Sequence, residues 1–100
     1  MTSYGFHPDA LLEYAEAAGY FAREASPEIA EGFIASVESG IAAVLAAPER
    51  WRIVEEPAIR RYVLRRFPYV VYYRWVDEQI TVYAVMHSSR QPGYWRERIV

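Results

Sequence analysis

Apolar residues recur at steps of three and four through the first half of the chain. From Pro8 they predict an amphipathic helix with the stripe Leu11, Tyr14, Ala15, Ala18, Phe21 and Ala22. Ser26, Pro27 and Glu28 then supply a cap, a first-turn proline and an acid, which predict a second helix that ends before Pro48. Its stripe is Ile29, Phe33, Val37, Ile41, Val44 and Leu45. The short connection predicts an antiparallel helical hairpin that covers one side of a sheet.

The second half changes to a period of two, which is typical of strands. Strands are predicted at residues 61–66, 69–76 and 79–87, with a short strand at 2–6 and an extended piece at 51–54. The connections Phe67-Pro68 and Asp77-Glu78 are short enough for hairpins, so the three long strands form an antiparallel meander. The chain is therefore predicted to be an α+β protein with the order β-α-α-β-β-β, in a single domain spanning residues 1–100.

Pairing Val76 with Gln79 across the Asp77-Glu78 turn assigns the side chains to two faces. One face is apolar and is expected to meet the helices: Tyr69, Val71, Tyr73, Trp75, Ile80, Val82, Ala84 and Met86. The other is expected to be open: Arg61, Val63, Arg65, Val70, Tyr72, Arg74, Thr81, Tyr83, Val85 and His87. The tail at 88–95 can fold beside the open face and bring Arg90 and Tyr94 to it. Trp75 is assigned to the core and Trp95 to a tail or partner contact.

Composition narrows the class of protein further. The chain has 100 residues, 53% of them hydrophobic, and no cysteine, which fits a reducing cytoplasm and excludes disulfides. Its two histidines lie 80 positions apart, so no metal site or cofactor is expected. The N-terminus lacks the pattern of a secretory signal, and no membrane partner is predicted.

Charge is divided between the two halves of the sequence. Residues 1–49 contain eight acids and one arginine, a net charge of −7, whereas residues 50–100 contain ten arginines and five acids, a net charge of +5. Two interpretations stay open: two solvated surfaces of opposite sign, or a basic face for an acidic partner. Arginine and tyrosine on the open face can bind phosphate and stack on bases, or can merely stabilise cross-strand pairs. Head-to-tail self-association through the opposite charges also stays open.

Two blocks of the sequence, FHPDALLEYAEAAGYF and RRFPYVVYYRWVDEQITVYAVMHSSRQPGYW, resemble the RelE/ParE superfamily of type II toxin–antitoxin toxins. The resemblance covers nearly the whole chain. It implies a RelE/ParE-like fold and a cytoplasmic bacterial toxin of a plasmid-stabilisation module, held inactive by a cognate antitoxin. ParE-like members inhibit DNA gyrase without nuclease chemistry, whereas RelE-like members are ribosome-dependent mRNA endonucleases.

The resemblance also suggests roles for residues. In a metal-independent endoribonuclease, the catalytic candidates would be Arg61, Arg74, His87 and Tyr94. The basic face that would bind target, nucleic acid or antitoxin would comprise Arg61, Arg65, Tyr72, Arg74, Tyr83, His87, Arg90 and Trp95. The absence of lysine, the pI near 5.7 and the His-x-x-Arg end of the last strand favour the ParE-like function. RelE-like mRNA cleavage is the alternative, and a non-toxic binding module with the same fold is the second alternative.

Overall fold

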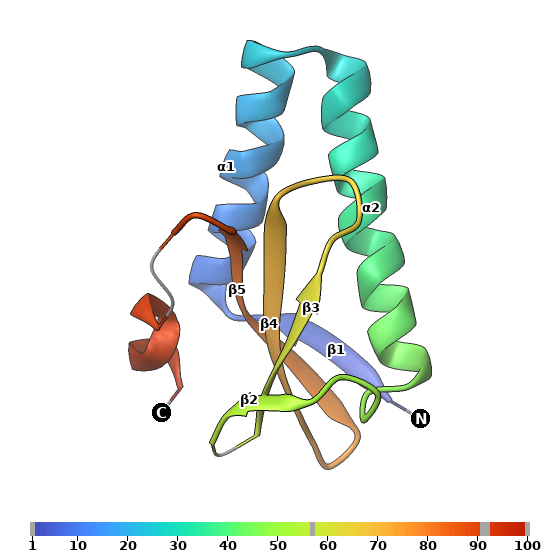
Figure 1. Cartoon of the computed structure of the whole chain (residues 1–100), viewed down its shortest axis with the longest axis vertical. Helices are drawn as coiled ribbons and strands as arrows, with labels where there is room; N and C mark the ends of the chain where they lie inside the picture. Colours follow the sequence, from blue (N-terminus) through green and yellow to red (C-terminus); the bar gives the residue numbers. More distant parts are fainter. Residues whose placement is uncertain (1, 57, 91–92, 100) are drawn as a thin grey trace.

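The computed structural model describes residues 2–56, 58–90 and 93–99, which fold as a helical hairpin on a five-stranded mixed sheet (Figure 1). This confirms the predicted α+β class. The elements in chain order are β1 (Ser3–Phe6), α1 (Pro8–Glu24), α2 (Pro27–Ala46), β2 (Ile53–Glu55), β3 (Ile59–Val63), β4 (Tyr69–Val76), β5 (Gln79–His87) and the 3-10 helix η1 (Tyr94–Arg98). The extended piece expected at 51–54 forms the short edge strand β2.

Local sequence signals set the ends of both helices. His7 Nδ1 accepts a hydrogen bond from the Asp9 N–H at 3.1 Å, and Ser26 Oγ accepts one from the Ile29 N–H at 3.1 Å. A proline follows each cap, where its missing N–H costs nothing. The predicted helix starts and the end of α2 before Pro48 are therefore confirmed.

The strands lie in the order β1-β5-β4-β3-β2, with β1 parallel to β5 and the other neighbours antiparallel. In the β4–β5 hairpin Val76 pairs with Gln79, as predicted. Asp77 and Glu78 have φ values of 53° and 63°, the left-handed pair that a two-residue hairpin turn requires.

The predicted two-residue loop at Phe67-Pro68 is wrong. Val63 pairs with Val70, so the chain turns through a wider loop. Pro68 has a fixed negative φ, which a tight hairpin turn with φ above zero cannot accept. The register moves by two residues and therefore preserves the faces. Arg61 stays on the predicted face, but Arg65 leaves the strand and enters the loop.

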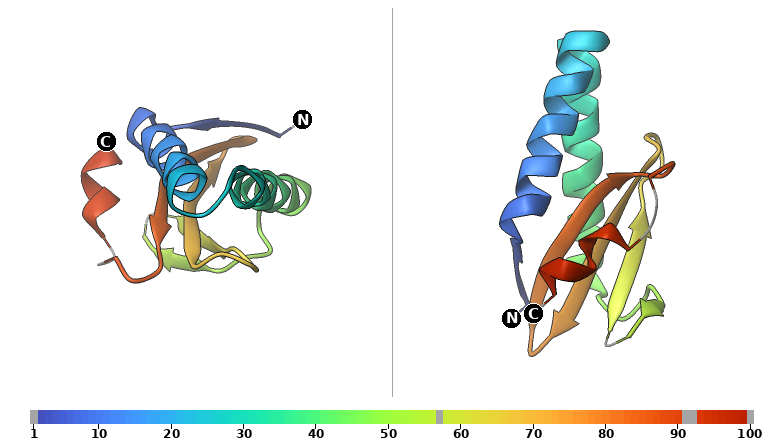
Figure 2. Two further views of the ribbon diagram at one scale, coloured as in Figure 1. Left: turned by 90° about the horizontal axis from the view of Figure 1, so that it is seen from above. Right: turned by 90° about the vertical axis from the view of Figure 1, so that its left-hand side faces the viewer.

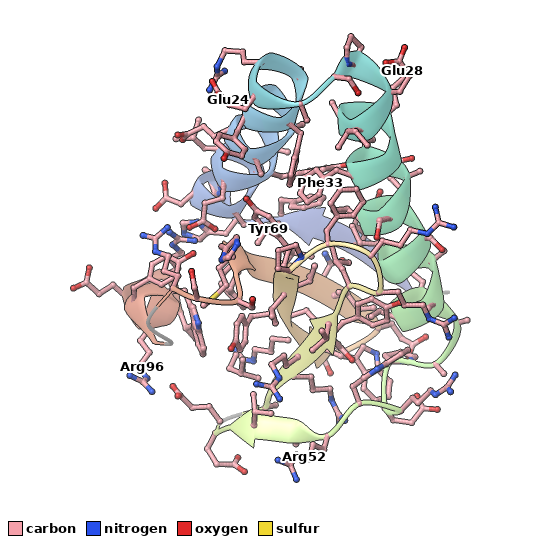
Figure 3. All side chains as sticks on the ribbon, turned by 45° about the horizontal axis from the view of Figure 1, so that its top comes forward. Glu24, Glu28, Phe33, Arg52, Tyr69 and Arg96 are labelled. Carbon is pink, nitrogen blue, oxygen red and sulfur yellow. The ribbon has the colours of Figure 1, made fainter. Side chains whose placement is uncertain are left out.

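The main core fills the space between the hairpin and the sheet, where Phe33 and Tyr69 lie (Figure 3). Phe33 is fully buried, and its ring centroid is 5.0 Å from that of Tyr69 and 5.1 Å from that of Phe21. The buried Tyr73 hydroxyl donates to the carbonyl of Pro48 at 2.9 Å. This face therefore joins both helices and the loop after α2 to the central strands.

The apolar stripes of the helices differ from the prediction at their ends. Leu11 and Ile29 are 53% and 45% exposed, whereas the small Ala10 and Ala17 are buried. The side of α1 that carries Ala10 and Ala17 packs closely against the sheet, because these side chains are small. Leu11 follows Ala10 directly and therefore points to a different side of the helix. Ile29 lies near the tip of the hairpin, which extends past the end of the sheet (Figure 1).

The helix α2 is long and apolar enough, by length and composition alone, to cross a bilayer, with a mean hydropathy of 1.6 over its best window. Its apolar stripe, however, is used in the core: Phe33, Val37 and Val44 are buried against the sheet. At Gly40 a Cβ would lie 2.7 Å from Cε1 of Tyr62, so only glycine permits this approach of α2 to β3.

Candidate functional site

A β-bulge in β5 changes the predicted distribution of side chains. Tyr72 pairs with Ala84 but Tyr73 pairs with Val82, so Tyr83 is an extra residue on β5. A bulge of this kind reverses the alternation of all the residues that follow it. The predicted faces are therefore wrong from this point to the end of the strand. Ala84 and Met86 lie on the second face, the one turned away from the helices, whereas Val85 and His87 lie on the helix face.

The second face is partly closed, and not open as predicted. A second hydrophobic cluster on it consists of Ile59, Val70, Tyr72, Ala84, Met86 and Trp95. Trp95 comes from η1, is only 2% exposed, and its ring centroid lies 4.9 Å from that of Tyr72. The prediction of a tail contact for Trp95 is confirmed. Tyr72 and Trp95 are buried together, so their rings are not surfaces on which a base could stack.

One carboxylate joins α1, β5 and the C-terminal segment, residues 93–99. Glu13 Oε1 accepts from the Val85 N–H at 3.1 Å and from Arg98 Nη1 at 3.0 Å. Its Oε2 accepts from Arg98 Nη2 at 2.9 Å and from the Tyr94 hydroxyl at 2.5 Å. We call this arrangement the Glu13 clasp. Figure 2 shows η1 beside β5 and the first turns of α1, which are the elements that the clasp connects.

The ionisation of the clasp follows from its contacts. Burial raises the pKa of Glu13, but hydrogen bonds from Arg98, Tyr94 and Val85 together outweigh it and leave the pKa below its usual value. Burial and the bond to Glu13 raise the pKa of Tyr94, although Arg90 lies over its ring with Cζ 3.6 Å from the centroid. The Glu13–Arg98 contact in the clasp is therefore an ion pair at neutral pH, and the protonated Tyr94 hydroxyl donates its hydrogen bond to Glu13.

The sequence-predicted site residues fall into separate groups. Arg61 and Arg74 lie on the second face, and Arg74 Nε is buried without a hydrogen-bond partner. His87 lies on the other face, where its ring centroid is 5.3 Å from that of Tyr69 and its Nδ1 accepts from the Ser89 N–H at 3.0 Å. Tyr83 packs at the edge of the second cluster. The structure does not bring the four catalytic candidates together.

Two grooves hold the remaining candidates. Arg65 and Arg66 line an open groove of about 470 Å³ between α2 and the β3–β4 loop, with small α2 side chains as its floor. His87 and Arg90 line a second open cleft of about 280 Å³ with Glu16 and Tyr20 of α1. Among residues 2–56, 58–90 and 93–99, no group of three or more His, Cys, Asp or Glu side chains is placed to hold a metal ion.

Comparison with known proteins decides the family. The model of the ParE toxin of type II toxin–antitoxin systems, parDE, matches residues 4–92. The chain belongs to the ParE toxin family. Among solved structures, the ParE-family chain is similar to a chain of the chromosomal ParDE toxin–antitoxin system from P. aeruginosa, with a TM-score of 0.74 and 18% sequence identity. That similarity covers 87% of this chain and 96% of the other, and shows that the fold is shared. No curated protein matches.

In this ParE-family chain, sequence reasoning missed Glu13 and Arg98. A signal for Glu13 was present, because it falls between Ala10 and Ala17 at the three- and four-residue spacing of the buried stripe. An acid at such a position predicts a buried partner. Nothing local identified Arg98 as that partner, since 85 positions separate the two residues.

Proposed function

We propose that this chain is the toxin of a type II toxin–antitoxin pair, that it inhibits DNA gyrase through protein contacts, and that a cognate antitoxin neutralises it in the cytoplasm. The observation that carries the proposal is the match to the ParE toxin family over residues 4–92. The fold similarity to a chain of a ParDE system supports it.

The placement of the candidate catalytic residues favours a toxin that acts by binding. General acid–base catalysis needs proton-transferring groups beside the scissile bond, together with cations that stabilise the developing charge. Here His87 lies on the helix face, while Arg61 and Arg74 lie on the second face. The Tyr94 hydroxyl is bound to Glu13 with a raised pKa, which makes it a poor proton donor.

An antitoxin with an acidic segment suits the groove beside α2. Arg65 and Arg66 line it and form no ion pair within the described part of the chain. β2 pairs with β3 only at Ile59 and Arg60, so Arg61 and Val63 lie at the sheet edge, where an extended segment can add a strand. We expect the double substitution Arg65→Glu and Arg66→Glu to weaken capture of the co-expressed antitoxin more than Arg23→Glu on α1 does.

The first test is controlled expression of the chain alone in bacteria, with DNA damage and mRNA integrity followed in parallel. Growth arrest with induced DNA damage and intact mRNA is expected, together with inhibition of supercoiling by purified gyrase. Rapid mRNA cleavage during translation would instead identify an endonuclease. Normal growth with soluble protein present would identify a non-toxic binding module.

The second candidate function is ribosome-dependent mRNA cleavage. One observation favours it: His87 and Arg90 share the cleft beside α1, so a proton-transferring group and a cation lie close to each other. If this function holds, His87→Ala abolishes toxicity and leaves antitoxin binding intact. If gyrase inhibition holds, His87→Ala is tolerated, whereas removal of residues 93–100 abolishes toxicity.

A further inference from the structure

Among the described residues, only side-chain contacts hold the C-terminal segment against the rest of the molecule. Its described backbone hydrogen bonds are internal, from the Arg96 N–H to the Gly93 carbonyl at 3.0 Å and from the Ile99 N–H to the Arg96 carbonyl at 3.1 Å. No backbone bond from residues 93–99 to the sheet is present within the described ranges. The position of the segment therefore depends on side-chain contacts, and the anchors at Trp95, Arg96 and Glu13 differ in kind.

Two of the anchors are expected to position the segment less firmly than the third, because one is not directional and the other is exposed. Trp95 supplies apolar burial against Tyr72, and apolar contact is not directional. Arg96 makes a bidentate pair with Glu55 through bonds of 2.7 and 2.6 Å, but its side chain is 60% exposed and projects outward (Figure 3). The bidentate geometry makes this pair directional, but solvent screens its charges more strongly than those of a buried pair.

The third anchor is Glu13, and the sheet itself holds this side chain in place. β1 pairs with β5 only as far as Val82, where the His7 N–H still bonds to the Val82 carbonyl at 2.8 Å. Beyond that point α1 replaces β1, and Glu13 Oε1 takes the Val85 N–H at 3.1 Å. The carboxylate thus continues the edge pairing of β5 where the neighbouring strand has ended.

The same carboxylate reaches both ends of η1. Tyr94 at its start donates to Glu13 Oε2, and Arg98 at its end contacts both carboxylate oxygens. Arg98 also donates to the carbonyl of the bulged Tyr83 at 2.8 Å. The side chains of Glu13 and Arg98 are each 13% exposed, so solvent screens this pair far less than the Arg96 pair.

We propose that Glu13 is the positioning residue of the C-terminal segment: its carboxylate holds residues 94–98 docked beside β5, and with them the surface that this segment presents to the target of the toxin. The docking step stands independently of the toxin's target. Only the last step, the presentation of the surface, rests on the proposed function.

The test compares Glu13→Gln with Glu16→Gln, an exposed acid one turn along α1, in the full-length chain. Glutamine can still accept the Val85 N–H, but it places an amide N–H₂ opposite Arg98 and removes the charge. Amide exchange at 94–99 and trypsin cleavage after Arg96 and Arg98 are expected to be roughly tenfold faster in Glu13→Gln, because hydrogen bonds to charged groups contribute on this scale. Exchange in β4 is expected to stay as in the wild type. Wild-type rates at 94–99 in Glu13→Gln would overturn the proposal, and so would equal acceleration by Glu16→Gln.

A double-substitution cycle separates positioning from general destabilisation. Glu13→Gln and Arg98→Met both remove the Glu13–Arg98 pair, and Arg98→Met also removes the bond to the Tyr83 carbonyl, so the combined variant should open the segment little more than Arg98→Met alone. Tyr94→Phe, which keeps the ring and loses only the hydroxyl, should give a smaller acceleration of the same exchange. Fully additive effects of Glu13→Gln and Arg98→Met would show that the two side chains act independently, contrary to the proposal.

Growth inhibition tests the part of the proposal that depends on the proposed function, which is the presentation of a surface to the target. Glu13→Gln should lose growth inhibition in proportion to segment release and should still be captured by the antitoxin. Fast exchange with full toxicity would preserve the docking role and contradict the presentation of the target surface. A wild-type chain that never inhibits growth would contradict the proposed function and leave the exchange result intact.

Discussion

The two faces of the sheet hold hydrophobic clusters of different construction. The helix face is covered by two long helices and by aromatic rings that interlock around Phe33. The second face is covered by one five-residue 3-10 helix, which depends on Trp95 and on the Glu13 clasp. We therefore expect the first cluster to hold the fold together and the second to hold a segment that opens without global unfolding. We accordingly expect substitutions on the two faces to differ in kind as well as in size.

The largest effect is expected on the helix face. Phe33→Ala leaves a cavity among at least four aromatic rings and should lower the free energy of unfolding by about 3–5 kcal/mol. Urea denaturation measures this loss in the free energy of unfolding. Ile34→Ala is the matched control on the same helix, because Ile34 is 36% exposed. A cost for Phe33→Ala as small as that of Ile34→Ala would show that the helix face is not the main core.

Trp95→Ala tests the second face. The side chain is as well buried as many core residues, but η1 can undock and limit the cost, so a loss of about 1–3 kcal/mol is expected. Hydrogen exchange should accelerate at residues 94–99 while β4 stays protected. Equal acceleration in both regions would mean that the two faces unfold as one unit, which would contradict the expected difference in stability between the two clusters.

Acid should weaken the clasp before it weakens the helix-face core. The pKa of Glu13 is below its usual value of 4.5, so its contribution to stability is present above that value and is lost as pH falls through the lowered pKa of the folded state. Arg90, Tyr94 and Arg98 face the carboxylate, and Asp9 pairs with Arg98 at 3.7 Å. Wild type should be more stable than Glu13→Gln at pH 7, and the difference in stability should close as the pH falls through the lowered pKa of Glu13. A gap that persists at pH 2 would show that the charge of Glu13 is not its source.

The smallest effect is expected for Arg96→Gln. This substitution breaks the bidentate pair with Glu55 at an exposed position, where solvent and salt screen the attraction. The unfolding midpoint should stay within experimental error of the wild type, and exchange at 94–99 should change less than in Glu13→Gln. A larger change would show that Glu55 on β2, and not Glu13 on α1, is the main anchor of the segment.

The candidate site was predictable only in part. Arg74 was assigned to the second face correctly, because β4 keeps the register that the Asp77-Glu78 turn establishes. Arg61 was also assigned to that face correctly, because the error in the β3–β4 register is two residues and an even shift preserves the faces. His87 was assigned to the wrong face, because one extra residue at Tyr83 reverses everything after it. Neither β-propensity nor alternation marks that residue: the sequence from Gln79 to His87 reads as one uninterrupted strand.

The sequence by itself determined the helix starts, the hairpin, the strand limits of β4 and β5 and the ParE-like family, since each depends on a local pattern or on a nearly continuous resemblance. Only the tertiary structure decided the bulge, the closed second face and the Glu13 clasp. The clasp depends on β1 ending at Phe6, so that α1 presents a carboxylate where a strand would otherwise continue. Such a contact joins residues more than 70 positions apart, and its energy comes from groups that no local window contains together.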